Sequence, residues 1–159
     1  MTLSITTNQE DFAELSEYYS EMNTRSLDLH PIERELGDIQ REELKLRFLS
    51  SPGTEVGGIV HGEVYWNKLS DWYLSQNPRR RGKQIMIDTQ RLKIDATTPG
   101  PGNTSIADRT SYKFEINTDY AAKQNEMRSL LFWNESLLEK TQNAILDYIT
   151  NGKINVHRP

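Results

Sequence analysis

The chain contains no cysteine and three histidines, so few of its side chains are of the kind that binds a transition metal. His30 precedes a predicted helix, His61 lies close to glycine residues, and His157 lies near the end of the sequence. Local zinc motifs use ligands only a few residues apart, and no pair of these histidines has that spacing. We therefore expect ordinary surface or core histidines, and neither a metal nor another cofactor.

Asp88 is the carboxylate with the most unusual position, because it follows the aliphatic run Ile85-Met86-Ile87. A carboxyl group in such surroundings could act as an acid or a base. Capping of Thr89 or an ion pair with Arg91 explains the residue more simply. Other carboxylates fall mostly on predicted helix faces, where solvated charge is the ordinary explanation. Since no set of acid, base and metal ligands emerges, the sequence predicts a protein that is not an enzyme.

Arg79, Arg80 and Arg81 form the basic cluster of a chain with a formal net charge of −4 and a pI of about 5.4. A dedicated nucleic-acid binder normally has a positive overall balance, so this class is disfavoured. The three arginines could contact DNA phosphates or an acidic protein partner, and a solvated loop is the third interpretation. We treat them as a candidate interface.

Neither the glycines nor the tryptophans indicate a ligand site by themselves. Gly57-Gly58 and the glycines near residue 100 lack the strand-loop-helix context of a phosphate-binding loop, so they predict turns. Trp66, Trp72 and Trp133 are expected to anchor the core or an interface rather than to form a ligand cage.

Three helices are expected to support these residues. Thr7 and Glu10 form a capping-box pair for the first helix, whose apolar face predicts docking on the rest of the protein. That face consists of Phe12, Leu15, Tyr19 and Met22. The second helix covers residues 31–48, and the charges between its apolar positions are interpreted as a solvated face. The third covers residues 134–150, with Asn134 as N-cap and Gly152 as stop.

The segment between these helices predicts strands and loops. Residues 59–66 and residues 85–89 alternate in polarity, and Leu92 and Ile94 extend the second alternation as a strand. A short helical turn is expected from Leu69 to Leu74. The Pro- and Gly-rich residues 97–104 predict a loop that projects from the sheet. Tyr112, Phe114 and Ile116 predict a half-buried strand that meets the last helix in one core.

The predicted fold class is α+β, with two N-terminal helices, a small, mostly antiparallel sheet with long loops, and a C-terminal amphipathic helix packed on it. The length favours a single domain over residues 1–159. Residues 1–50 form its helical part, residues 56–118 its strands and loops, and residues 153–159 a polar tail. No apolar run approaches membrane-spanning length and no signal peptide is evident, so we expect a soluble, unexported protein without membrane contact.

Several motifs occur in a specific order along the chain. Trp66 is followed by Leu69-Ser70, the basic passage, and then Asp88-Thr89 and Leu92. This order resembles the tail-completion, or virion-morphogenesis, proteins of tailed bacteriophages, the Mu-like group among them. In that family a glycine usually stands where this chain has Gln90.

Two later clusters extend the resemblance to the last helix. Tyr120-Ala121 is followed by Gln124, and Arg128 is followed by Leu131. The family has a comparable Tyr-Ala pair with His or Gln shortly after it, and then an Arg-x-Phe-Leu cluster. The chain departs from the pattern in lacking a glycine after Gln124.

The resemblance implies a structural protein of the phage head-tail interface, or neck, that forms a ring and helps to finish the tail. It further implies a hexameric ring in the virion, contacts with tail-tube, terminator and connector proteins, and DNA passing through the channel without specific binding. The location would be the virion, and the host cytoplasm during assembly. An acidic partner-binding protein, such as a secretion chaperone or an immunity protein, is the alternative. A small nuclease or hydrolase is the least supported class.

Overall fold

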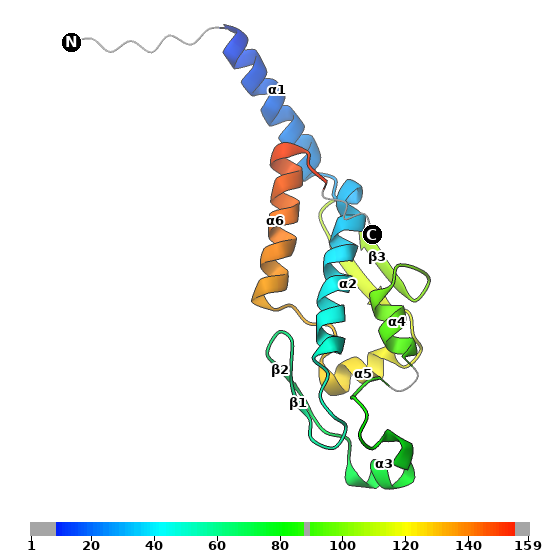
Figure 1. Ribbon diagram of the computed structural model, residues 1–159. Coiled ribbons are helices and arrows are strands. Elements are labelled where there is room, and N and C mark those ends of the chain that lie inside the picture. Colours follow the sequence, from blue (N-terminus) through cyan, green and yellow to red (C-terminus); the bar gives the residue numbers. More distant parts are fainter. Residues whose placement is uncertain (1–8, 88–89, 155–159) are drawn as a thin grey trace, which may run out of the picture.

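The computed structural model describes residues 9–87 and 90–154 and confirms the α+β class (Figure 1). Among these residues, three helices are long: α1 (Gln9–Ser26), α2 (Glu33–Leu49) and α6 (Glu135–Asn151). The shorter helical segments are η1 (His30–Ile32), α3 (Asp71–Gln76), η2 (Pro78–Arg80), α4 (Arg91–Thr97) and α5 (Ala121–Arg128). The strands are β1 (Gly58–Val60), β2 (Val64–Trp66), β3 (Asn103–Ala107) and β4 (Tyr112–Ile116).

Helix α2 packs against elements from several parts of the chain. It contacts α4, α6, β3 and β4, and it follows directly after η1. Two hydrophobic clusters lie along it. Leu44 and Phe48, near its C-terminal end, belong to the first cluster, whose other buried members are Val60, Trp66, Ile85, Leu92, Ala96, Ala121 and Leu130. Leu36, near its N-terminal end, belongs to the second, together with Leu29, Ile32, Ala107, Ala144 and Tyr148.

The solvated face that the sequence suggested for α2 holds for Arg34, Glu42 and Lys45, which are exposed, but not for four other charged residues. Glu35, Arg41, Glu43 and Arg47 are all buried. Arg47 is fully buried and donates hydrogen bonds to the carbonyl oxygens of Leu130 at 2.8 Å and Phe132 at 3.0 Å. It also donates to Glu43 Oε1 at 3.1 Å, and its guanidinium lies 3.7 Å from the centroid of the Phe132 ring. The prediction failed for Arg47 because its charge satisfies backbone carbonyls of a distant segment, and for Glu43 because it balances that charge.

The predicted single sheet is instead two separate antiparallel hairpins, β1-β2 and β3-β4. Residues 59–66 form the first hairpin rather than one strand, since the chain turns at Gly62 and Glu63, both with positive φ. The predicted alternation still holds there. Val60 and Trp66 are buried, whereas Ile59 and Tyr65 are exposed. The Trp66 ring packs edge-on against Phe48, with ring centroids 6.5 Å apart.

Residues 85–87 do not form the predicted strand. Met86 has a left-handed φ of 60°, and Leu92 and Ile94 belong to helix α4. The aliphatic side chains pack into the core from a turn. Its backbone groups form individual hydrogen bonds with other parts of the chain instead of the regular ladder of a strand. Ser51 Oγ donates to the Ile85 carbonyl at 2.7 Å, and the Ile85 amide donates to the carbonyl of Pro52 at 2.9 Å. Asp88 and Thr89 lie outside the described residues.

The second hairpin confirms the strand predicted at residues 112–116 and shortens the loop predicted at residues 97–104. Helix α4 continues to Thr97, and β3 begins at Asn103. The side-chain Nδ2 of buried Asn103 donates to the carbonyl oxygens of Asp95 at 2.6 Å and Thr98 at 2.7 Å. The loop is therefore tied to α4, and its final residues belong to the sheet instead of projecting from it.

Helix α6 has the predicted caps but a different packing. Asn134 Oδ1 accepts a hydrogen bond from the Leu137 amide at 2.7 Å, and Gly152 takes a left-handed φ of 64°. The helix packs against α1 and α2 rather than on the sheet. Of the β4 side chains, Tyr112 joins the cluster of α6, whereas Phe114 and Ile116 pack against the other cluster. The prediction of one shared core is therefore correct for Tyr112 and wrong for Phe114 and Ile116, whose cluster lies near the other end of α2.

Helix α1 is docked by its C-terminal end and not along the predicted apolar face (Figure 1). Arg25 Nε donates to the carbonyl of Ile149 at 2.8 Å, and Arg25 Nη2 donates to that of Thr150 at 3.2 Å. Leu15 is 48% exposed and Tyr19 is 60% exposed. Thr7 and the side chains of Glu10 and Phe12 lie outside the description.

No helix in the described part of the chain is both long enough and apolar enough to cross a membrane.

Replacing Arg47 by Met tests the buried charge pair. The variant leaves the Glu43 carboxylate without its cationic partner and two backbone carbonyls without a donor. We expect the free energy of unfolding, measured by urea denaturation, to fall by about 3–5 kcal/mol. The double variant Arg47→Met/Glu43→Gln should regain part of this loss. Lys45→Met, in an exposed pair on the same helix, should cost less than about 1 kcal/mol. Equal costs for the Arg47 and Lys45 variants would contradict the assignment.

Candidate partner-binding pocket

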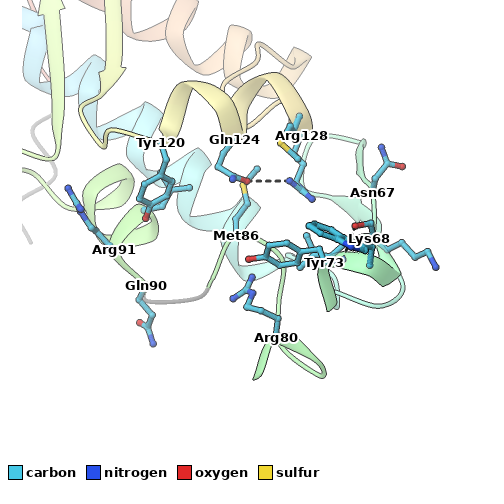
Figure 2. A pocket seen from close by; sticks show the side chains of 15 residues that line it. Asn67, Lys68, Tyr73, Arg80, Met86, Gln90, Arg91, Tyr120, Gln124 and Arg128 are labelled. Carbon is cyan, nitrogen blue, oxygen red and sulfur yellow. Dashed lines mark hydrogen bonds between the residues drawn. The ribbon is translucent and has the colours of Figure 1, made fainter. Parts of the chain in front are cut away.

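An open pocket of about 700 Å³ lies where α3, the start of α4 and α5 come together (Figure 2). Its volume is in the range of known ligand pockets, about 300–1,000 Å³. The described walls come from residues 67–73, from residues 80–86 and 90–92, and from residues 120–128. The same three parts of the chain carry the sequence motifs that resemble the tail-completion proteins.

Most of the described motif residues either line this pocket or support its walls. Those that line it are Leu69, Ser70, Leu92, Tyr120, Gln124 and Arg128. Trp66 and Ala121 are buried in the cluster beneath it, and Leu131 packs against that cluster. Asp88 and Thr89 belong to the motif but lie outside the described residues. Motifs that are separated in sequence are therefore brought together in space.

The Trp-x-x-Leu-Ser motif builds the turn that leads into α3. Trp66 anchors the end of β2 in the core, and the Leu69 amide donates to the Thr54 carbonyl at 2.8 Å. Ser70 is the N-cap of α3, and its Oγ accepts a hydrogen bond from the Tyr73 amide at 3.2 Å. The cap fixes the start of the helix, and Trp72 and Tyr73 follow in its first turn.

Gln90 occupies a backbone position that favours glycine. It is the N-cap of α4, with a left-handed φ of 61° and ψ of −4°. Side chains other than glycine are strained in this region. A glycine at this position, as in the family that the sequence resembles, would have the same turn without that strain.

Arg128 reaches into the pocket from the last turn of α5 (Figure 2). It is 7% exposed, and its Nη1 donates to Gln124 Oε1 at 3.3 Å. Its buried Nε has no hydrogen-bond partner among the described residues. Burial, and then the charge of Arg80, lowers the pKa of the Arg128 guanidinium from its ordinary value. A carboxylate placed here would satisfy the free donor and relieve the repulsion.

Arg80 corrects the prediction of a basic interface at residues 79–81. It is 5% exposed and lines the pocket, donating to the carbonyl of Ile87 at 3.2 Å and approaching that of Gln84 at 3.4 Å. Arg79 and Arg81 are exposed, and Arg81 pairs with Glu55 at 3.2 Å. The three arginines thus do not act as one exposed patch, because the middle one holds the turn together.

The rim of the pocket combines aromatic and positively charged side chains. Trp72 is 74% exposed, and Tyr73, Tyr120 and Met127 are also exposed. Lys68 and Arg91 add positive charge at the edge, each with an acidic neighbour outside the pocket lining. Exposed aromatic rings beside arginines are typical of protein interfaces. Of the three tryptophans, Trp66 is in the core, while Trp72 and Trp133 are exposed.

The described histidines each lie beside a carboxylate. His61 Nε2 lies 3.4 Å from Glu43 Oε2, and His30 Nδ1 lies 2.7 Å from Asp28. Within the described ranges, no group of three or more histidine or acidic residues could hold a metal ion. His157 lies outside them.

Comparison with protein-family models, curated proteins and solved structures found no match to this chain.

Sequence reasoning missed the contributions of Tyr73, Met127 and Arg80 to the pocket. One signal was present, since Tyr120, Gln124 and Met127 recur at the spacing of a single helix face. Arg80 had no such signal, because its position depends on contacts with a turn that the sequence did not predict.

Replacing Gln90 by Gly tests the left-handed cap of α4. The change removes side-chain strain of about 1–2 kcal/mol and adds a backbone entropy cost of about 0.5–1 kcal/mol, so it should stabilise the protein by about 1 kcal/mol or less. Urea denaturation measures the difference. The matched control Lys93→Gly, inside α4, should instead destabilise by about 1 kcal/mol. Equal losses in both variants would show that the cap is not strained.

Proposed function

We propose that the protein is a structural subunit of the head-tail interface of a tailed bacteriophage and binds its neighbours through the pocket. The observation that carries this proposal is the convergence of the motifs. Segments around residues 69, 92 and 124 are far apart in sequence, yet they line the same cavity. If the motif residues served only to pack the core, they would be scattered through it. Because they meet at one surface instead, a binding role fits them better.

The proposed mechanism is complementarity of shape and charge, without a chemical step. The buried guanidinium of Arg128 provides a donor for a carboxylate, and the aromatic rim provides apolar contact area. A neck subunit must contact neighbours on two sides, and head-to-tail contacts of this kind close into a ring when the rotation per subunit permits it. The negative net charge favours DNA passage, because a like-charged ring does not retain the genome by non-specific attraction.

The finer assignment follows the family that the sequence resembles. The subunit would form a hexameric ring in the virion, contact tail-tube, terminator and connector proteins, and let DNA pass through the channel without specific binding. It would assemble in the host cytoplasm. None of these contacts requires a cofactor or an enzymatic reaction.

An acidic partner-binding protein, such as a secretion chaperone or an immunity protein, is the second candidate. The pocket itself supports it, since one basic, aromatic cavity is sufficient to hold one segment of one partner. The two functions differ in the number of surfaces required. A ring subunit needs two complementary surfaces, and a binder of a single partner needs one.

The test of the neck assignment uses a tailed phage or prophage that encodes this chain. Purified virions should contain the protein at the head-tail joint. Met127→Glu adds a negative charge at the exposed pocket rim and should leave the fold intact while heads and tails remain separate in electron micrographs. The matched variant Leu146→Glu, equally exposed on α6 away from the pocket, should assemble normally. Virions that lack the protein, or that join normally with Met127→Glu, would favour the second candidate.

A further inference from the structure

The exposed part of α1 is both apolar and acidic. Leu15, Tyr18 and Tyr19 are exposed, and together with Met22 they recur at i, i+3, i+4 and i+7 on one face of the helix. Proteins that bind an amphipathic helix in a groove recognise anchors at this spacing. Within their own subunit these three exposed anchors remain accessible to solvent.

The charge of α1 is opposite to that of the pocket. Glu14 and Glu17 lie beside the apolar anchors, Glu10 and Asp11 precede them in the sequence, and Arg25 is the basic residue of the helix. The described residues that line the pocket include Lys68, Arg80, Arg91 and Arg128 and no aspartate or glutamate. Lys68 is paired with Asp71, and Arg91 with Asp95 and Asp119, just outside the lining, so the positive charge within the pocket comes mainly from Arg80 and Arg128.

The two surfaces lie at opposite ends of the molecule (Figure 1). Helix α1 extends beyond the end of α6, whereas α3 and α5 form the other end. A helix of its length, 18 residues, spans about 27 Å, so several of its turns stand clear of the body. The anchors of one subunit therefore cannot fill the pocket of the same subunit, but they can reach the pocket of a second copy.

We infer that α1 of one subunit binds in the pocket of the next copy of the chain. Leu15, Tyr18 and Tyr19 contact the aromatic rim, and a glutamate of α1 reaches Arg128, whose Nε lacks a partner among the described residues. Because the two surfaces are different, each copy uses one of each, and the contact is heterologous. Repetition of this contact builds a closed ring or an open chain. The inference rests on the proposed function only in identifying the ring as that of a phage neck.

The absence of cysteine from the chain allows a direct test. Tyr19→Cys and Met127→Cys place one thiol on each surface, both at exposed positions. When the two single variants are mixed and treated with a short bismaleimide, α1-in-pocket contact should give a cross-linked dimer that contains one of each. The double variant should give a ladder of larger products, because every copy then carries both surfaces.

Matched controls separate this contact from random collisions. Pairing Tyr19→Cys with Leu146→Cys, an equally accessible thiol on α6, should give at least tenfold less dimer. Adding Glu14→Lys and Glu17→Lys to the Tyr19→Cys variant should lower the dimer yield by a similar factor, as should high salt, since the contact depends on opposite charges. A yield that is the same in all these pairs overturns the inference.

Other outcomes identify a different occupant. Protection of the Met127→Cys thiol by a single-stranded oligonucleotide, with no α1 cross-link, would assign the pocket to nucleic acid and overturn the inference. Cross-linking inside assembled virions separates it from the function proposed above. If the protein is present at the joint but the Tyr19–Met127 cross-link does not form there, only the α1 contact is contradicted. If the cross-link forms in purified protein but virions lack the protein, only the neck assignment is contradicted.

Discussion

The arrangement of the whole molecule depends on Arg47. Its guanidinium is enclosed between α2 and the segment that joins α5 to α6, where it binds two backbone carbonyls and stacks on Phe132. Glu43 balances the charge and accepts a further hydrogen bond from Asn134, the N-cap of α6. A buried ion pair is costly to break on one side only, so α5 and α6 are held in register with α2. Because α5 forms one wall of the pocket, the position of that wall is fixed in the same way.

Local signals in the sequence were sufficient for most of the helices. Asn134 and Gly152 mark the ends of α6, because capping is a contact between residues close in the chain. The strand at residues 112–116 was predicted for a similar reason, since alternation is a local pattern. The buried charges of α2 were not predictable in this way. What makes them tolerable is a set of carbonyls more than eighty residues further along the chain.

The pocket was only partly predictable. The spacing of Tyr120, Gln124 and Met127 indicates one face of α5. The opposite wall depends on the turn at residues 85–87, where alternating polarity had predicted a strand. Isolated aliphatic residues such as Ile85 can fill a core from a turn when side chains like those of Arg80 and Ser51 bind the backbone. The resemblance to tail-completion proteins singled out residues that line or underlie one cavity, without indicating that they share it.

Arg25 fixes the direction in which α1 leaves the body of the molecule. It clamps the end of α1 to two carbonyls at the end of α6, while Glu21 holds its remaining nitrogen at 3.0 Å. The direction of α1 relative to the body is therefore set at one small joint. In an assembly built through α1, that direction determines the turn between consecutive subunits, and hence the circumference at which the assembly closes. A slight rotation at Arg25 would change the diameter of the central opening without altering any contact in the pocket.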